Sequence, residues 1–256
     1  TNPVTSDLPE YLLAARSDDL ASVVDAYVGL LETVRGRLRP IPTVDVGGNR
    51  VHALGDAPNE AALGFLRDVI RDEGLESMFG IAVDASAGDW WTADGYVLPV
   101  SGRRFGPGEL DAWWLRMIEA FDIELLEDPF GERDRAGWRD LHARRPASCR
   151  VLGDNYTSTD LAQLSGEGKA ADVDGVLVKP NQNGTVSGTL AFAAASKAAG
   201  LMVVASHRSV ETESTMLVEL ADEMGADALK IGPFRDFTAV IKANELLRGW
   251  GGGWSA

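Results

Sequence analysis

Cysteine is almost absent from this chain, and long apolar runs are missing altogether. The single cysteine, Cys149, excludes a disulfide framework within the chain, so a reducing cytoplasm is the compartment we expect. No apolar run approaches the roughly 20 residues that a membrane-spanning helix needs, so we expect no membrane association. Residues Thr1 to Glu10 also lack the basic-then-apolar pattern of a secretory signal.

Positive charge is scarce relative to negative charge. The 256 residues include 24 Lys and Arg against 39 Asp and Glu, a formal net charge of −15. Binding to nucleic acid needs clustered cations that displace counterions from phosphates, so this balance argues against a nucleic-acid partner. An anionic small molecule is still compatible, because a few local cations and a metal ion can override the mean charge.

The first third of the chain has a helical pattern. Apolar residues recur at spacings of three and four from about Pro9 to Arg39, with Ser17 or Asp18 as a point where a second helix could begin. A turn-like segment follows at 45–48, and another helix is predicted over 59–72. The three consecutive glycines near the end predict a flexible tail over 249–256. We treat residues 1–256 as one domain.

After residue 78 the pattern changes to short apolar runs that alternate with helix-length segments. Strands that alternate with helices favour an α/β fold with parallel pairing and right-handed crossovers. The expected strands are Phe79–Asp84, Ile123–Asp128, Arg150–Asp154, Gly175–Lys179, Met202–His207 and Ala228–Gly232. The expected helices include Leu110–Phe121, Ala136–Ala143, Thr185–Ala199 and Ser214–Met224.

Each predicted strand carries an unusual polar residue at or near its C-terminal end. These residues are Asp84, Glu127, Asp154, Lys179, His207 and Lys230. In a parallel β/α barrel the C-terminal ends of the strands form one face, and that face carries the active site. Only six βα units are visible, however, whereas a closed barrel needs eight strands. The pattern therefore favours an enzyme with an incomplete barrel.

Three of these residues are carboxylates on successive strand ends. Asp84, Glu127 and Asp154 are oxygen donors of the kind that Mg²⁺ prefers. Each acid taken singly is more often a helix cap or a surface charge, but the succession favours a metal site.

The remaining residues supply positive charge and hydrogen-bond donors. A partly desolvated Lys179 or Lys230 near another cation is a candidate general base, and pairing with a barrel acid is the structural alternative. His207, Arg208 and Ser209 suit a phosphate or carboxylate group, although Ser209 could instead cap the next helix.

Taken together, these segments resemble the enolase family, in order and over nearly the whole chain from about Glu10. The resemblance is specific because many short motifs occur together rather than one alone. The motifs are Asp84–Ser86, Leu126–Phe130, Gly153–Asp154, Val178–Gln182 with Gly184–Thr185, Ser206–Ser209 with Glu211–Glu213, Leu229–Gly232 and Asn244–Arg248.

The resemblance implies a role for each candidate residue. It makes Asp84, Glu127 and Asp154 the Mg²⁺ ligands and Lys179 the base that removes the proton α to the carboxylate. Lys230 would be a second cation beside that carboxylate. That enolase-superfamily sites combine a Lys or His base with one or two Mg²⁺ ions is a known property of the superfamily, not a deduction from this sequence.

The same resemblance places three further residues around the substrate. His207 would lie near the departing group. Arg208 and Ser209 would hold the phosphate.

Departures from the enolase pattern suggest altered chemistry. The usual Asp-Glu-Gly-Gly reads Asp45–Val46–Gly47–Gly48, and valine cannot transfer a proton. The usual Asp-Asp pair reads Asp154–Asn155, and the loop after Ser209 has Val210 and Ser214 in place of Gly and Asp.

The first two barrel strands and the capping domain of enolases are not apparent. Six strands would leave open sheet edges, so we expect a second polypeptide to supply the missing part, as in a split enolase, or contacts in a homo-oligomer to cover it.

The leading hypothesis is a Mg²⁺-dependent lyase of specialised metabolism. It would form or use the enolate of a small phosphorylated or phosphonylated carboxylate, similar to phosphoenolpyruvate. One alternative is an ordinary 2-phosphoglycerate hydro-lyase whose partner supplies the missing acid. A second is a non-catalytic scaffold subunit derived from an enolase.

Overall fold

The computed structural model describes residues 4–46, 49–106, 108–165, 168–208, 211–234 and 236–251. The chain forms two compact units. The first combines residues 1–17 with 25–151, and the second combines residues 18–24 with 152–256.

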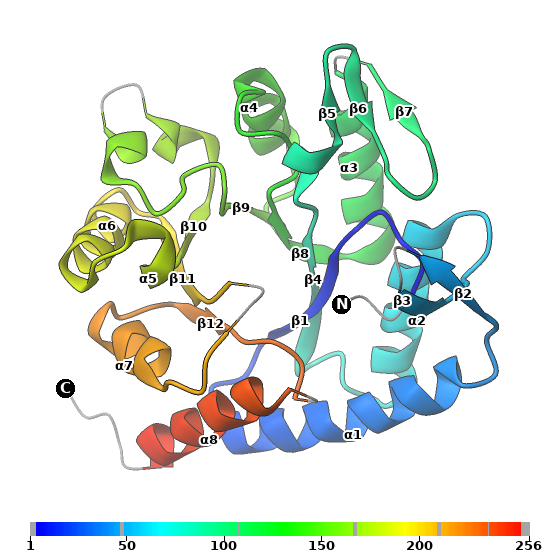
Figure 1. The fold of residues 1–256 in the computed structure, drawn as a ribbon, viewed down its shortest axis with the longest axis horizontal. Coiled ribbons are helices and arrows are strands. Elements are labelled where there is room, and N and C mark those ends of the chain that lie inside the picture. Colours follow the sequence, from blue (N-terminus) through cyan, green and yellow to red (C-terminus); the bar gives the residue numbers. More distant parts are fainter. Residues whose placement is uncertain are drawn as a thin grey trace. The chain divides into compact units, whose positions relative to one another are not determined.

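Three neighbouring strands of the main sheet belong to the first unit. β4 (Phe79–Asp84) pairs in parallel with β8 (Ile123–Glu127), and β1 (Glu10–Ala15) lies antiparallel along β4 (Figure 1). Every residue of β4 is buried. An uninterrupted buried run of this kind is typical of a strand that is covered on both faces.

The helical prediction over residues 9–39 is wrong in its first part. Residues Glu10 to Ala15 form β1, and the helix α1 spans only Leu20–Leu38. Alanine, leucine and glutamate favour a helix locally, but pairing along all six residues of β4 overrides that weak preference. β1 therefore adds a seventh strand to the six that the sequence predicts. Because β1 precedes α1, the expectation that no strand of this sheet lies before the predicted helices is wrong for β1.

The other helices of the first unit agree closely with the prediction. They are α2 (Pro58–Asp72), α3 (Glu109–Phe121) and α4 (Arg135–Arg144). The buried residues of α3 recur at helical spacing, namely Leu110, Trp113, Trp114, Met117 and Ile118. Buried Asp111 on the same helix forms an ion pair with Arg144 of α4, which ties the two helices together.

Two small antiparallel sheets interrupt this βα pattern in the first unit. β2 (Thr43–Val46) and β3 (Asn49–His52) pair with each other. Asp45 and Val46 of the predicted turn are strand residues, and its other two residues lie outside the described part. β5 (Trp91–Thr92), β6 (Gly95–Val97) and β7 (Arg104–Phe105) form a second sheet, after the short helix η1 (Ala87–Trp90). The sequence analysis did not anticipate this second sheet.

The second unit contains a run of parallel strands. β10 (Gly175–Val178) pairs with both β9 (Arg150–Gly153) and β11 (Met202–Ser206), and β11 pairs with β12 (Ala228–Lys230). All four strands were predicted, and each ends one or two residues earlier in the structure than in the prediction. The helices are η2 (Leu161–Leu164), η3 (Lys169–Asp172), α5 (Pro180–Asn183), α6 (Val186–Ala198), α7 (Met216–Glu223) and α8 (Phe237–Gly251).

The α/β fold class predicted from the sequence is therefore confirmed. Helix α8 includes residues 249–251 of the predicted tail, and residues 252–256 lie outside the described part. None of the helices in that part is long and apolar enough to cross a lipid bilayer.

A buried tyrosine links β6 to the loop before α4. The Tyr96 hydroxyl donates to Oδ2 of Asp134 at 2.7 Å and accepts from the backbone N–H of Gly131 at 3.1 Å. Asp134 also caps α4 by accepting from the backbone N–H of Gly137. Burial, followed by the hydrogen bond to Asp134, raises the pKa of Tyr96 well above its ordinary value.

Replacing Tyr96 by Phe should lower the free energy of unfolding by about 1–3 kcal/mol, because Asp134 and Gly131 lose a buried partner. Since the pKa is raised on folding, this stabilisation is fully present below the pKa of an unfolded tyrosine, about 10, and is lost as the pH rises above it. Urea unfolding at pH 7 and at pH 10.5 would measure both effects. Arg104→Ala, an exposed change on β7 of the same small sheet, serves as the control. An unchanged midpoint of Tyr96→Phe at pH 7 would contradict this interpretation.

Candidate active site

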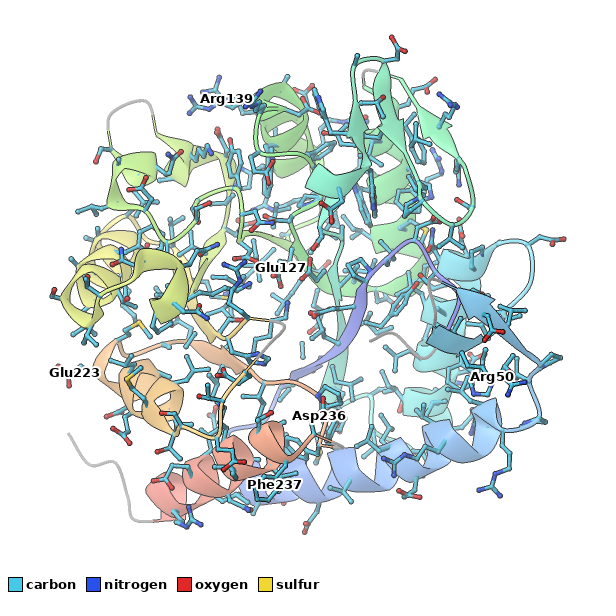
Figure 2. All side chains as sticks on the ribbon, viewed as in Figure 1. Arg50, Glu127, Arg139, Glu223, Asp236 and Phe237 are labelled. Carbon is cyan, nitrogen blue, oxygen red and sulfur yellow. The ribbon has the colours of Figure 1, made fainter. Side chains whose placement is uncertain are left out.

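Two carboxylates lie side by side where parallel strands of the first unit end. Asp84 of β4 and Glu127 of β8 are partners in the strand register, so their side chains point to the same face of the sheet. Glu127 is labelled in Figure 2. Their exposures are only 7% and 4%. Burying two like charges next to each other is unfavourable unless positive charge or hydrogen bonds compensate.

The turn after β4 supplies part of that compensation. The backbone N–H and the hydroxyl of Ser86 both donate to Oδ1 of Asp84, at 3.0 and 3.1 Å. Ser86 adopts the left-handed conformation that places these donors, with φ of 42°. Asp128, directly after Glu127, is also left-handed, with φ of 44°. Non-glycine residues in this region are uncommon and are concentrated at functional sites.

The donor set fits a hard divalent cation. Carboxylate oxygens are the ligands that Mg²⁺ prefers, and a cation would relieve the repulsion between two adjacent buried acids. Within the described residues, no group of three or more His, Cys, Asp or Glu side chains is close enough to hold a metal ion. The first unit thus provides a pair of candidate ligands, Asp84 and Glu127, and Asp154 belongs to the second unit.

The second unit holds a buried ion pair between two of the predicted residues. The Nζ atom of Lys179, directly after β10, donates to Oδ2 of Asp154, directly after β9. Both residues are 7% exposed. A buried ammonium and carboxylate are tolerated together because each neutralises the other. Sequence reasoning weighed this pairing as the structural alternative for Lys179, and the structure shows it.

Lys230 lies on the same strand ends. Ser206 of β11 is its partner in the register of β11 and β12, and Val178, immediately before Lys179, is the partner of Ala205. Lys179, Ser206 and Lys230 therefore follow one another across three adjacent strands. Lys230 is half-buried.

His207 contacts backbone groups through both ring nitrogens. The N–H of Gly232 can only donate, so Nε2 of His207 accepts from it at 3.1 Å. Nδ1 then carries the proton and donates to the carbonyl of Arg208 at 2.6 Å. The neutral imidazole therefore links the loop after β11 to the loop after β12.

A buried lysine that sequence reasoning missed lies behind His207. Lys242 of α8 is 1% exposed and donates to the carbonyl of Thr212 at 2.7 Å. Its Nζ atom is 3.8 Å from Oε2 of Glu211, which is 3.9 Å from Nδ1 of His207. A cavity beside them has a volume of about 300 Å³ and is also lined by Gly232, Asp236, Thr238 and Ala239, with Asp236 just before α8 (Figure 2). Because Lys242 lies within an otherwise ordinary amphipathic helix, no sequence signal distinguished it.

The other predicted residues are placed less completely. Arg208 is exposed. Ser209 lies outside the described residues, as do Gly47 and Gly48 of the altered motif. The backbone of Val46 ends β2, and its side chain is not among those described.

This arrangement of acids and lysines on parallel strand ends can be compared with known families. Residues 31–250 match the family model of the enolase C-terminal TIM barrel domain. The chain belongs to the enolase family. The predicted resemblance and the incomplete barrel of the enolase type are thereby confirmed, and the family is one of lyases.

Similar proteins are named enolase in three organisms. The enolase of Acidothermus cellulolyticus is 30% identical over 249 residues, covering 94% of this chain and 57% of the relative. The enolases of Pyrobaculum aerophilum and Anaplasma phagocytophilum are 28% and 26% identical, over 94% and 91% of this chain. They are covered over 58% and 53% of their own lengths. This chain therefore spans little more than half of each of these relatives.

The ion pair should be detectable as an energetic coupling. We expect Lys179→Met and Asp154→Asn each to lower the free energy of unfolding by about 3–5 kcal/mol without Mg²⁺, because each leaves a buried charge uncompensated. The loss in the double variant should be smaller than the sum of the two single losses, and the difference should exceed about 1 kcal/mol. Urea unfolding of the four proteins measures this coupling. Additive losses would contradict the pairing.

Proposed function

We propose that this chain carries the lyase chemistry of an enolase-like, Mg²⁺-dependent enzyme. The substrate would be a small phosphorylated or phosphonylated carboxylate, similar to phosphoenolpyruvate or 2-phosphoglycerate. Lys179 would remove the proton α to the carboxylate. The observation that carries this proposal is the buried Lys179, oriented by Asp154 at the carboxyl ends of adjacent parallel strands, in a chain of the enolase family.

Three features of Lys179 suit it to proton transfer. Its ammonium is buried, so few water molecules compete for it. Its orientation is restricted by the contact with Asp154, which reduces the entropy lost when a substrate binds. Its position after β10 corresponds to the face where β/α barrels place their active sites. Once the ammonium has lost a proton to solvent, the neutral amine fixed in this way can accept a proton from a substrate carbon atom held next to it.

We further propose Asp84, Glu127 and Asp154 as the residues that would hold Mg²⁺. This ligand set follows the family pattern, and the two buried in-register acids of the first unit support it. When bound, the ion would supply positive charge that stabilises the charge developing on the substrate carboxylate.

The remaining assignments concern substrate binding. Lys230, one strand beyond Ser206, would contribute a second cation beside the carboxylate. Arg208 and Ser209 would bind the phosphate or phosphonate. His207 would keep the loops that carry these groups together, because it bonds to Gly232, and would lie near the departing group.

We also propose that a second polypeptide supplies part of the functional enzyme. With Val46 at the position of the usual glutamate, the chain lacks the acid that would expel a hydroxyl group there. Enolate formation without ordinary water loss is therefore the favoured chemistry, unless a partner provides that acid.

Two assays test this proposal. The first monitors turnover of 2-phosphoglycerate in the presence of Mg²⁺ through the absorbance of the enolpyruvate product. The second measures binding of phosphoenolpyruvate by thermal shift. We expect binding that depends on Mg²⁺, with a higher melting temperature because the ligand binds only the folded state. Lys179→Ala should lower any turnover by about 10²-fold or more, since it removes the base. Arg50→Ala, an exposed change on β3, serves as a control (Figure 2).

The outcomes separate the alternatives. Turnover of 2-phosphoglycerate that depends on Lys179 would identify an ordinary hydro-lyase and overturn the emphasis on Val46. Binding without turnover, by the chain alone and with a co-purified polypeptide, would support altered chemistry. Neither binding nor turnover with the partner present would leave a scaffold role as the better interpretation.

A further inference from the structure

A closed ring of hydrogen bonds surrounds the Lys179–Asp154 pair within the second unit. The backbone N–H of Lys179 donates to the hydroxyl of Thr159 at 3.0 Å. That hydroxyl contacts Oε1 of Gln182 at 2.7 Å, and Nε2 of Gln182 is 3.5 Å from Oδ1 of Asp154. The ion pair between Asp154 and Lys179 closes the ring. Each of these four residues thus contacts two others of the ring.

The donors and acceptors in this ring can point in only one direction. A backbone N–H always donates, so the Thr159 oxygen accepts from Lys179 and must place its single proton elsewhere. The acceptor within reach is Oε1 of Gln182. This orientation turns the NH₂ group of Gln182 toward the carboxylate of Asp154, the arrangement in which a donor faces an acceptor. The Thr159 hydroxyl therefore determines how the glutamine amide is oriented.

The backbone at Thr159 is held in an unfavourable conformation. Ser158 and Thr159 have φ angles of 53° and 48°, a region that is costly for a β-branched residue. Thr159 is completely buried, and its carbonyl accepts from Nδ2 of Asn183 at 3.0 Å. Two residues of α5 thus hold the strained segment. Gln182 contacts the hydroxyl of Thr159, and Asn183 contacts its carbonyl. Strain of this kind persists only where surrounding contacts enforce it.

We propose that Thr159 and Gln182 are positioning residues that fix the Lys179 ammonium and the Asp154 carboxylate in their working geometry. Thr159 holds the backbone at Lys179, and Gln182 holds the far oxygen of Asp154. This inference rests on the proposed function, which assigns Lys179 as the base and Asp154 as a metal ligand. The geometry of the ring is independent of that function.

The experiment compares Thr159→Val with Thr159→Ser in the full chain. Valine keeps the shape and removes the hydroxyl, whereas serine keeps the hydroxyl and removes only a methyl group. The first readout is the rate at which a trace of acetic anhydride acetylates Lys179, measured by mass spectrometry. We expect the rate to rise about ten-fold in Thr159→Val, the factor that one buried hydrogen bond supports, and to stay at the wild-type value in Thr159→Ser.

Two further variants separate a specific effect from general loosening. Thr157→Val removes another fully buried hydroxyl from the same loop, one whose recorded contact is the carbonyl of Gly153, so Lys179 labelling should not change. Gln182→Met removes both amide contacts at a half-buried position that the fold should tolerate, so labelling should rise as in Thr159→Val. This second variant keeps the test decisive if Thr159→Val does not fold.

Calorimetric titration with Mg²⁺ alone provides the second readout. Losing a hydrogen bond that orients a metal ligand typically lowers metal affinity about 10- to 100-fold. Thr159→Val and Gln182→Met should therefore bind Mg²⁺ more weakly by that factor. Wild-type labelling rates in both variants would overturn the positioning role, as would an equal rise in Thr157→Val. If labelling changes as expected but wild-type protein binds no Mg²⁺, the ring is established and the proposed metal function fails.

Discussion

The need to compensate buried charge at the ends of parallel strands governs this structure. In the second unit the Lys179–Asp154 ion pair meets that need, and neither residue is more than 7% exposed. A carboxylate or ammonium buried alone would be strongly unfavourable, so the two strand ends must stay in register for the fold to persist. The loop after β9 and the short helix α5 are arranged around this pair through Thr159 and Gln182.

The first unit faces the same constraint with two buried acids. Asp84 and Glu127 are buried partners in adjacent strands, and the recorded donors to Asp84 come from the left-handed residue Ser86. A unit that buries two adjacent acids is suited to receive a cation.

Local sequence preference was a good guide where it agreed with the tertiary environment. The runs Phe79–Asp84, Ile123–Asp128 and Arg150–Asp154 were predicted as strands because they are short, apolar and bounded by polar residues. Residues Glu10 to Ala15 have helix-favouring side chains, and only their pairing with β4 makes them a strand. The sheet formed by β5 to β7 depends on two- and three-residue pairings, which leave no periodicity to read.

By itself the sequence determined the α/β class, the family and the set of polar residues at strand ends, because buried strands and family motifs are written in local order. The tertiary structure decided which of those residues touch. It paired Lys179 with Asp154, oriented His207 through Gly232, and brought Thr159 and Gln182 together although 23 positions separate them in the chain. Such contacts depend on strand register and on left-handed backbone turns, which a one-dimensional pattern does not encode.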